Sequence, residues 1–137
     1  MQSYGLGLMV EPFVAIEAEF ALHSWLGGDG ECVTGDPTRL VTDDRGAWRR
    51  SELGAALSVT ERDQLDEAHS IAAGALRAAN YSGPFSIDAF RYRDEGRQLQ
   101  FCALSEINAR YSMGFFVGMR GCCAEWMQRV CADVSPQ

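Results

Sequence analysis

The segment Ser105-Glu106-Ile107-Asn108-Ala109-Arg110 places a carboxylate, a carboxamide and a guanidinium at alternate positions. Side chains of an extended chain alternate between two faces, so Glu106, Asn108 and Arg110 are expected to project to one side. Carboxylate and amide oxygens suit Mg²⁺, which proteins usually hold through few side chains together with substrate phosphates. An arginine two residues further on reaches a phosphate or acyl-phosphate oxygen as a planar fork. The segment therefore predicts metal-assisted chemistry on a nucleoside triphosphate.

A second carboxylate, Asp88, lies one hairpin upstream in Ser86-Ile87-Asp88-Ala89-Phe90. Three hard-oxygen side chains that converge from neighbouring strands would repel one another without a cation. We therefore predict that at least two of Asp88, Glu106 and Asn108 bind a metal ion. The alternative is that Asp88 is a solvated strand residue and that Arg110 is a surface cation paired with Glu106.

These four residues, in this order on two strands, resemble the metal-binding end of the ATP-grasp ligases, which include D-alanine ligases, biotin carboxylases and carbamoyl-phosphate synthetases. The resemblance implies that Glu106 bridges two Mg²⁺ ions, for which Mn²⁺ can substitute, while Asn108 and Asp88 hold one each. It also implies that a carboxylate attacks ATP to give an acyl phosphate, which an amine or other nucleophile then opens. Arg110 would act catalytically by stabilising the oxyanion of each step.

The resemblance continues upstream, in Val10-Glu11-Pro12-Phe13-Val14 and Glu19-Phe20-Ala21-Leu22. These segments are similar to the hinge strand of the family and to the strand after it, and the likeness covers about residues 10–114. The family's hinge backbone holds adenine, and a later acidic residue often binds the ribose. The resemblance therefore implies nucleotide contacts for Glu11, Phe13, Val14 and Glu19, with Glu17 equally well placed for the ribose. The alternative for each glutamate is a solvated strand residue.

The wider pattern predicts an α+β fold, in which a mostly antiparallel sheet is flanked by two main helices. Ser58-Val59-Thr60-Glu61 is a capping box, and apolar residues at helical spacing behind it predict a helix that ends near Asn80. A second amphipathic helix is expected from Met113 to about Val134, with an inward stripe of Phe116, Met119, Cys123, Met127 and Val130. His69 would be solvated on the first helix, and His23 would be a structural strand residue.

The remaining segments are read from turn residues and alternation. Strands are expected at residues 9–14 (an edge strand or hinge), 15–25, 31–41 with a break at Asp36-Pro37, 85–92 and 99–107. Turns are expected at residues 27–30, 43–46 and 94–97, and residues 47–57 read as a loop with a short helical piece.

Composition excludes several classes of partner. The chain of 137 residues has the length of one domain, and its net charge of −7 without a basic tract argues against nucleic-acid binding. It has no apolar stretch long enough for a membrane span, and its first residues do not resemble a signal peptide. Five cysteines without a regular framework predict reduced thiols, which we interpret as small buried residues. A cytoplasmic location is therefore expected.

Complete ATP-grasp enzymes also carry an N-terminal substrate domain and a lid whose lysines hold phosphates. This chain has no lysine before Glu11. The resemblance thus implies that residues 1–137 are one C-terminal-like domain, a partial enzyme that acts on ATP and a small carboxylate and needs a missing N-terminal part or subunit for turnover. The rival hypothesis is a non-catalytic α+β binding domain with a vestigial metal motif, which forms a homodimer through an exposed edge at residues 10–14.

Overall fold

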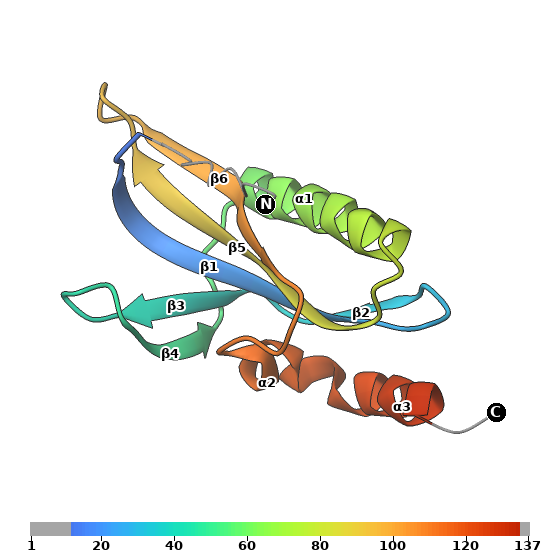
Figure 1. Ribbon diagram of the computed structural model, residues 1–137. Helices are drawn as coiled ribbons and strands as arrows, with labels where there is room; N and C mark the ends of the chain where they lie inside the picture. The colour runs from blue at the N-terminus through green and yellow to red at the C-terminus, as the bar shows by residue number, and fades with distance from the viewer. Residues whose placement is uncertain (1–11, 135–137) are drawn as a thin grey trace, which may run out of the picture.

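The computed structural model describes residues 12–134, which form a six-stranded antiparallel sheet with helices on both faces (Figure 1). The strand order is β4-β3-β1-β5-β6, and β2 pairs with the far end of β1. The elements are β1 (Ala15–Leu26), β2 (Cys32–Thr34), β3 (Thr38–Thr42), β4 (Trp48–Leu53), α1 (Val59–Ala78), β5 (Gly83–Arg93), β6 (Leu99–Asn108), α2 (Phe115–Gly118), the 3-10 turn η1 (Met119–Cys122) and α3 (Cys123–Val134). The predicted α+β class is confirmed.

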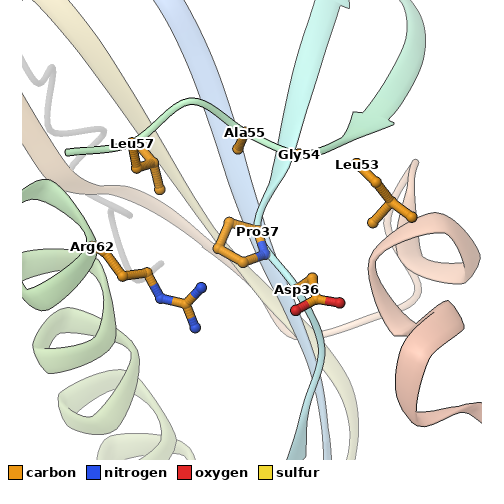
Figure 2. Close-up of a pocket in the computed structure, with 7 residues that line it drawn as sticks. All are labelled: Asp36, Pro37, Leu53, Gly54, Ala55, Leu57 and Arg62. Atoms are coloured by element: carbon orange, nitrogen blue, oxygen red, sulfur yellow. The ribbon is translucent and has the colours of Figure 1, made fainter. Parts of the chain in front are cut away.

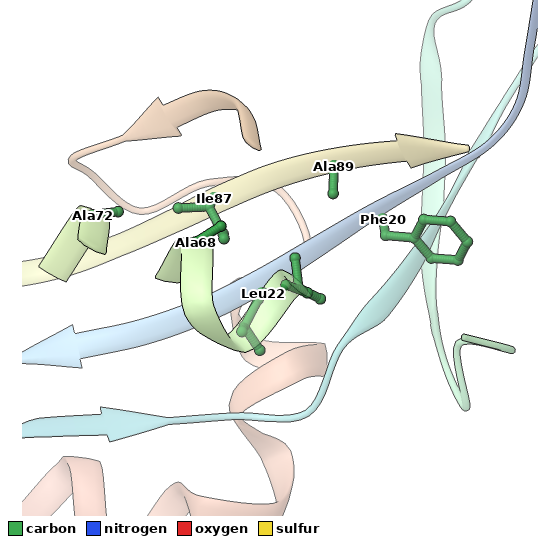
Figure 3. Packing of buried hydrophobic residues seen from close by; sticks show 7 residues of the cluster. Phe20, Leu22, Ala68, Ala72, Ile87 and Ala89 are labelled. Atoms are coloured by element: carbon green, nitrogen blue, oxygen red, sulfur yellow. The ribbon is translucent and has the colours of Figure 1, made fainter. Parts of the chain in front are cut away.

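One face of the sheet packs against α1. Figure 3 shows the cluster that joins them, in which side chains from β1 and β5 meet small residues of the helix. Its buried members are Phe20, Leu22, Leu65, Ala68, Ala72, Ile87 and Ala89. Small residues on the helix let it lie close to the sheet, and this packing gives the face its core.

The start of α1 is fixed by the predicted capping box. The Ser58 hydroxyl accepts a hydrogen bond from the Glu61 amide at 3.2 Å, and the Glu61 carboxylate accepts one from the Ser58 amide at 2.8 Å. The same carboxylate pairs with Nε of Arg91 on β5 at 2.7 Å. This ion pair lowers the pKa of Glu61 to about 2 and ties the helix to the sheet.

The opposite face packs against the C-terminal helices. Trp25 and Val33 contact Phe115 and Met119, and half-buried Cys122, Trp126 and Val130 complete the cluster. The predicted continuous helix is wrong, because the 3-10 turn η1 separates α2 from α3. The predicted stripe is correct for Met119 and Val130 but wrong for Phe116, Cys123 and Met127, which are exposed. A 3-10 turn has three residues per turn and so changes the helical phase, which makes Phe115, Met119 and Cys122 the inward residues.

Two strand predictions are also wrong. Residues 12–14, the described part of the expected strand at 9–14, are not in a strand, and β1 begins at Ala15. Residues 48–53, read as part of a loop, form the edge strand β4. The first three side chains of β4 are exposed, so this strand lacks the alternation that marks a half-buried strand. The other strands and turns fall where they were expected, including the break at Asp36-Pro37.

Several single-residue predictions are corrected. His69 is buried rather than solvated, because its ring stacks on Phe85 and its Nε2 lies 2.6 Å from the Ser24 hydroxyl. The cysteines are not buried: Cys32, Cys102 and Cys122 are half-buried, while Cys123 and Cys131 are exposed. Within residues 12–134 the structure contains no helix long and apolar enough to cross a membrane.

Candidate functional site

The register of β5 and β6 brings the predicted metal ligands together. Asp88 lies directly opposite Glu106, and Ser86 lies opposite Asn108. Opposed residues of an antiparallel pair project from the same face. The flanking residues Ile87 and Ala89 pack under α1, so Asp88, Glu106 and Asn108 lie on the other face of the sheet.

A hydrogen-bonded chain links three of the four side chains. Asn108 Nδ2 donates to Asp88 Oδ2 at 3.1 Å, and Arg110 Nη2 donates to Asn108 Oδ1 at 3.0 Å. Burial raises the pKa of Asp88 to about 6, the Glu106 carboxylate adds to the rise, and the hydrogen bond from Asn108 opposes it. The Asp88 anion is thus held in a place where a cation would stabilise it.

Glu19 joins this group from β1. It pairs with Phe90 on β5, two residues from Asp88, so it shares the face of Asp88, and its charge also raises the pKa of Asp88. Glu17, the competing residue, instead forms an ion pair with Arg93. Of the two glutamates, Glu19 therefore lies beside the predicted metal ligands.

These side chains line one pocket of about 220 Å³, which we call the charged pocket. Its lining consists of Glu19, Leu40, Thr42, Gly46, Trp48, Asp88, Glu106, Asn108, Arg110, Ser112 and Met113. Within residues 12–134 no three His, Cys, Asp or Glu side chains are arranged to hold a metal ion by themselves. The Asp88 and Glu106 carboxylates suit Mg²⁺, and the Asn108 amide oxygen, which accepts from Arg110, keeps a second lone pair; phosphate or water oxygens would complete the coordination.

The part of the hinge segment that the structure describes lies beside a second, apolar pocket. Pro12 and Val14 line this pocket of about 300 Å³ together with Phe90, Tyr92, Cys102, Leu104 and Ser105. Phe13 is fully exposed and does not line it. Glu11 lies outside the described residues. Ser105 immediately precedes Glu106, and Phe90 pairs with Glu19, so lining residues of the apolar pocket are neighbours of lining residues of the charged pocket.

Hydrogen bonds to polar side chains of β1 and β5 anchor the loop that carries Arg110. The Ser86 and Ser112 hydroxyls lie 2.8 Å apart, and His23 Nε2 lies 3.3 Å from the Met113 carbonyl. Burial lowers the pKa of His23 to about 4, so the ring is neutral at pH 7 and its Nε2–H donates to that carbonyl. His23 is thus a structural strand residue, as expected, but it supports the candidate site.

Sequence reasoning missed the wall of the charged pocket that β3 and β4 supply. Leu40, Thr42 and Trp48 reach the site because β3 pairs with β1 beside Glu19 and β4 pairs with β3. The Gly46 turn gave a hairpin signal, but the fully exposed start of β4 carried no alternation.

A larger pocket of about 310 Å³ lies elsewhere, between the β2–β3 link, the β4–α1 link and α1 (Figure 2). Its charged residues are Asp36 and Arg62, and Nε of Arg62 already pairs with Asp66 at 2.8 Å. Without converging carboxylates it is a weaker candidate than the charged pocket.

No protein-family model matches the sequence, and a comparison with curated proteins gives no match. Solved structures do share the fold. N5-carboxyaminoimidazole synthetase from Staphylococcus aureus, complexed with ADP, is 17% identical, with a TM-score of 0.52 over 74% of this chain and 25% of that chain. N5-carboxyaminoimidazole ribonucleotide synthetase from Thermus thermophilus is 23% identical, with a TM-score of 0.52 over 73% and 25% of the two chains.

The phosphoribosylaminoimidazole carboxylase ATPase subunit from Aquifex aeolicus is 16% identical, with a TM-score of 0.51 over 75% of this chain and 28% of that chain. These neighbours are ATP-grasp enzymes, and at such identities the likeness is one of fold alone. The chain has the fold found in part of an ATP-grasp enzyme. The enzymes with this fold that the comparison found are synthetases of N5-carboxyaminoimidazole ribonucleotide. The chain spans about a quarter of their length.

Proposed function

We propose that this chain is the ATP- and Mg²⁺-binding part of an ATP-grasp carboxylate ligase. The observation that carries the proposal is the presence of two pockets whose lining residues are neighbours on β1, β5 and β6, one apolar beside Val14 and one charged around Asp88 and Glu106. The two ends of ATP match the two pockets, because ATP has a flat apolar base at one end and an anionic triphosphate at the other. The ADP bound to the Staphylococcus aureus structure is consistent with such a ligand.

Each residue then has a role that its position supports. Pro12, Val14 and Leu104 would contact adenine, and Glu19, which lines the charged pocket and pairs with Phe90 of the apolar pocket, would accept hydrogen bonds from the ribose. Asp88, Glu106 and Asn108 would hold Mg²⁺, which when bound neutralises negative charge on the phosphates. The Nη2 donor of Arg110 is oriented by Asn108, which fixes the guanidinium where it can stabilise an oxyanion.

The proposed reaction joins a small carboxylate to an amine or another nucleophile through an acyl phosphate. The carboxylate oxygen attacks the γ-phosphorus of ATP and ADP leaves; the nucleophile then attacks the acyl carbon and inorganic phosphate leaves. We propose that a separate N-terminal part supplies the rest of the phosphate and substrate contacts, and that the protein acts in the cytoplasm.

The proposal is tested by thermal denaturation with Mg²⁺ and ADP. Ligand at one hundred times its Kd stabilises by about 2.7 kcal/mol, so Tm should rise by about 9 °C for a chain of this length. Glu106→Ala should abolish the rise. Glu67→Ala, the same change at an exposed position of α1, should leave it intact.

Two results would contradict the proposal: no rise in Tm for the parent protein, or an equal rise in Tm for Glu106→Ala.

Light scattering on the same samples tests the rival hypothesis. A tight homodimer that is indifferent to nucleotide would favour a non-catalytic interaction domain, whereas a monomer stabilised by nucleotide favours the ligase.

A further inference from the structure

The lining of the charged pocket also includes three large apolar residues. They are Leu40 on β3, Trp48 on β4 and Met113 in the loop after Arg110, and we call them the Trp48 wall. Leu40 and Trp48 lie on the other side of β1 from the strands β5 and β6 that carry Asp88 and Glu106. The nucleotide and metal roles proposed above use none of its residues.

Trp48 offers a ligand its ring and little else. The indole N–H already donates to the Ser51 hydroxyl at 3.2 Å, which orients the ring. The side chain is 37% exposed, and Trp48 belongs to none of the three hydrophobic clusters among residues 12–134. Met113 is likewise large, apolar and exposed. Isolated exposed apolar residues are ordinary, but these line a pocket that also holds converging polar groups.

Arg110 lines the same pocket and lies in the chain between Asn108 at the end of β6 and Met113 of the Trp48 wall. Its Nη2 is bound to Asn108 and its Nη1 lies 3.4 Å from the Tyr111 carbonyl, which leaves part of its five-donor fork for an anion. The pocket volume of about 220 Å³ is below the ~300–1,000 Å³ of pockets for drug-sized ligands, so a single ring fits better than a larger scaffold.

We propose that the Trp48 wall binds the ring of an aromatic or heteroaromatic carboxylate, whose carboxylate lies beside Arg110. A planar ring stacks on an indole face more favourably than a saturated ring of the same size. This inference rests on the proposed function and names the class of its carboxylate substrate.

Calorimetric titration with benzoate, in the presence of Mg²⁺ and ADP, tests the inference. Benzoate should bind the parent protein and Trp48→Phe, and should bind Trp48→Ala at least tenfold more weakly. Cyclohexanecarboxylate should bind the parent several-fold more weakly than benzoate, and acetate should respond little to Trp48→Ala. Benzoate should also quench tryptophan fluorescence in the parent and in Trp126→Phe, but not in Trp48→Phe.

Equal benzoate binding by the parent and Trp48→Ala would overturn the inference, as would equal affinity for benzoate and cyclohexanecarboxylate. The titration is repeated without nucleotide, so that the two proposals can fail separately. If the parent does not bind Mg²⁺ and ADP but still binds benzoate more tightly than Trp48→Ala does, the ligase proposal alone is overturned. If the parent binds Mg²⁺ and ADP but binds benzoate no more tightly than Trp48→Ala does, the inference about the Trp48 wall alone is overturned.

Discussion

Asn108 is the residue on which the candidate site is centred. Its amide nitrogen donates to Asp88 while its amide oxygen accepts from Arg110. A carboxamide carries both a donor and an acceptor, whereas an aspartate at position 108 would set a third carboxylate against Asp88 and Glu106. The alternation of Glu106, Asn108 and Arg110 thus supplies a carboxylate, a bridge and a cation in a fixed order.

At the scale of single residues, His23 should make stability depend on pH. Its pKa is lowered from 6.5 to about 4 by burial, so the unfolded chain binds more protons between these values. The contribution of His23 to stability should therefore fall as pH drops from 6.5 to 4, by up to about 3 kcal/mol, whereas Asp88, whose pKa is raised to about 6, contributes in the opposite direction. His23→Gln retains a donor for the Met113 carbonyl but cannot titrate. Denaturation curves at pH 4 to 7 should show that the parent loses stability relative to this variant as the pH drops, and parallel pH profiles would contradict the assignment.

At the scale of elements, the tight turn before α2 fixes the loop that carries Arg110. Gly114 has φ +89°, and a Cβ there would lie 2.3 Å from Ser51 Oγ and 2.9 Å from Ser51 Cβ. Gly114→Ala should cost about 2–4 kcal/mol through backbone strain and this collision. It should also reduce the rise in Tm that Mg²⁺ and ADP produce.

Gly54 provides the matched control for that variant. Its φ is +76°, but a Cβ there would meet nothing within 4 Å. Gly54→Ala should therefore cost about 1–2 kcal/mol from the backbone alone and leave the ligand response unchanged. Equal losses of stability in the two variants would show that the contact with Ser51 is unimportant.

The elements differ in how well sequence predicted them. The helix α1 was predicted closely because its signals, the capping box and the spacing of Leu65, Ala68 and Ala72, are local. The strand β4 was missed because an edge strand with exposed side chains carries no periodic signal. The broken C-terminal helix was missed because the 3-10 turn at Met119–Cys122 changes the phase within an otherwise helical pattern.

At the scale of the whole molecule, the two helical layers lie on opposite faces of the sheet, and only one of them lies on the face that carries the site. The α1 layer packs on the face away from the charged pocket, whereas Phe115 follows the site loop and contacts His23. Leu65→Ala and Phe115→Ala should both cost about 3–5 kcal/mol, because each removes a fully buried side chain. Only Phe115→Ala should also weaken the binding of Mg²⁺ and ADP.

The comparison is made by calorimetric titration at a temperature where both variants remain folded by circular dichroism. Unchanged affinity in Phe115→Ala would mean that the C-terminal helices stabilise the sheet without supporting the site. Equal loss of affinity in Leu65→Ala would mean that the affinity follows overall stability rather than the layer.

The sequence alone determined what depends on neighbours a few residues apart. Alternation put Glu106 and Asn108 on one face, and the capping box set the start of α1. The tertiary structure decided which distant segments meet there: Glu19 rather than Glu17 beside Asp88, Trp48 in the same pocket, and buried His23 beneath the loop. Such meetings depend on the register of strands far apart in the chain. A shift of one residue would turn every side chain of a strand to the other face, so the burial of one face of the whole sheet decides which residues meet.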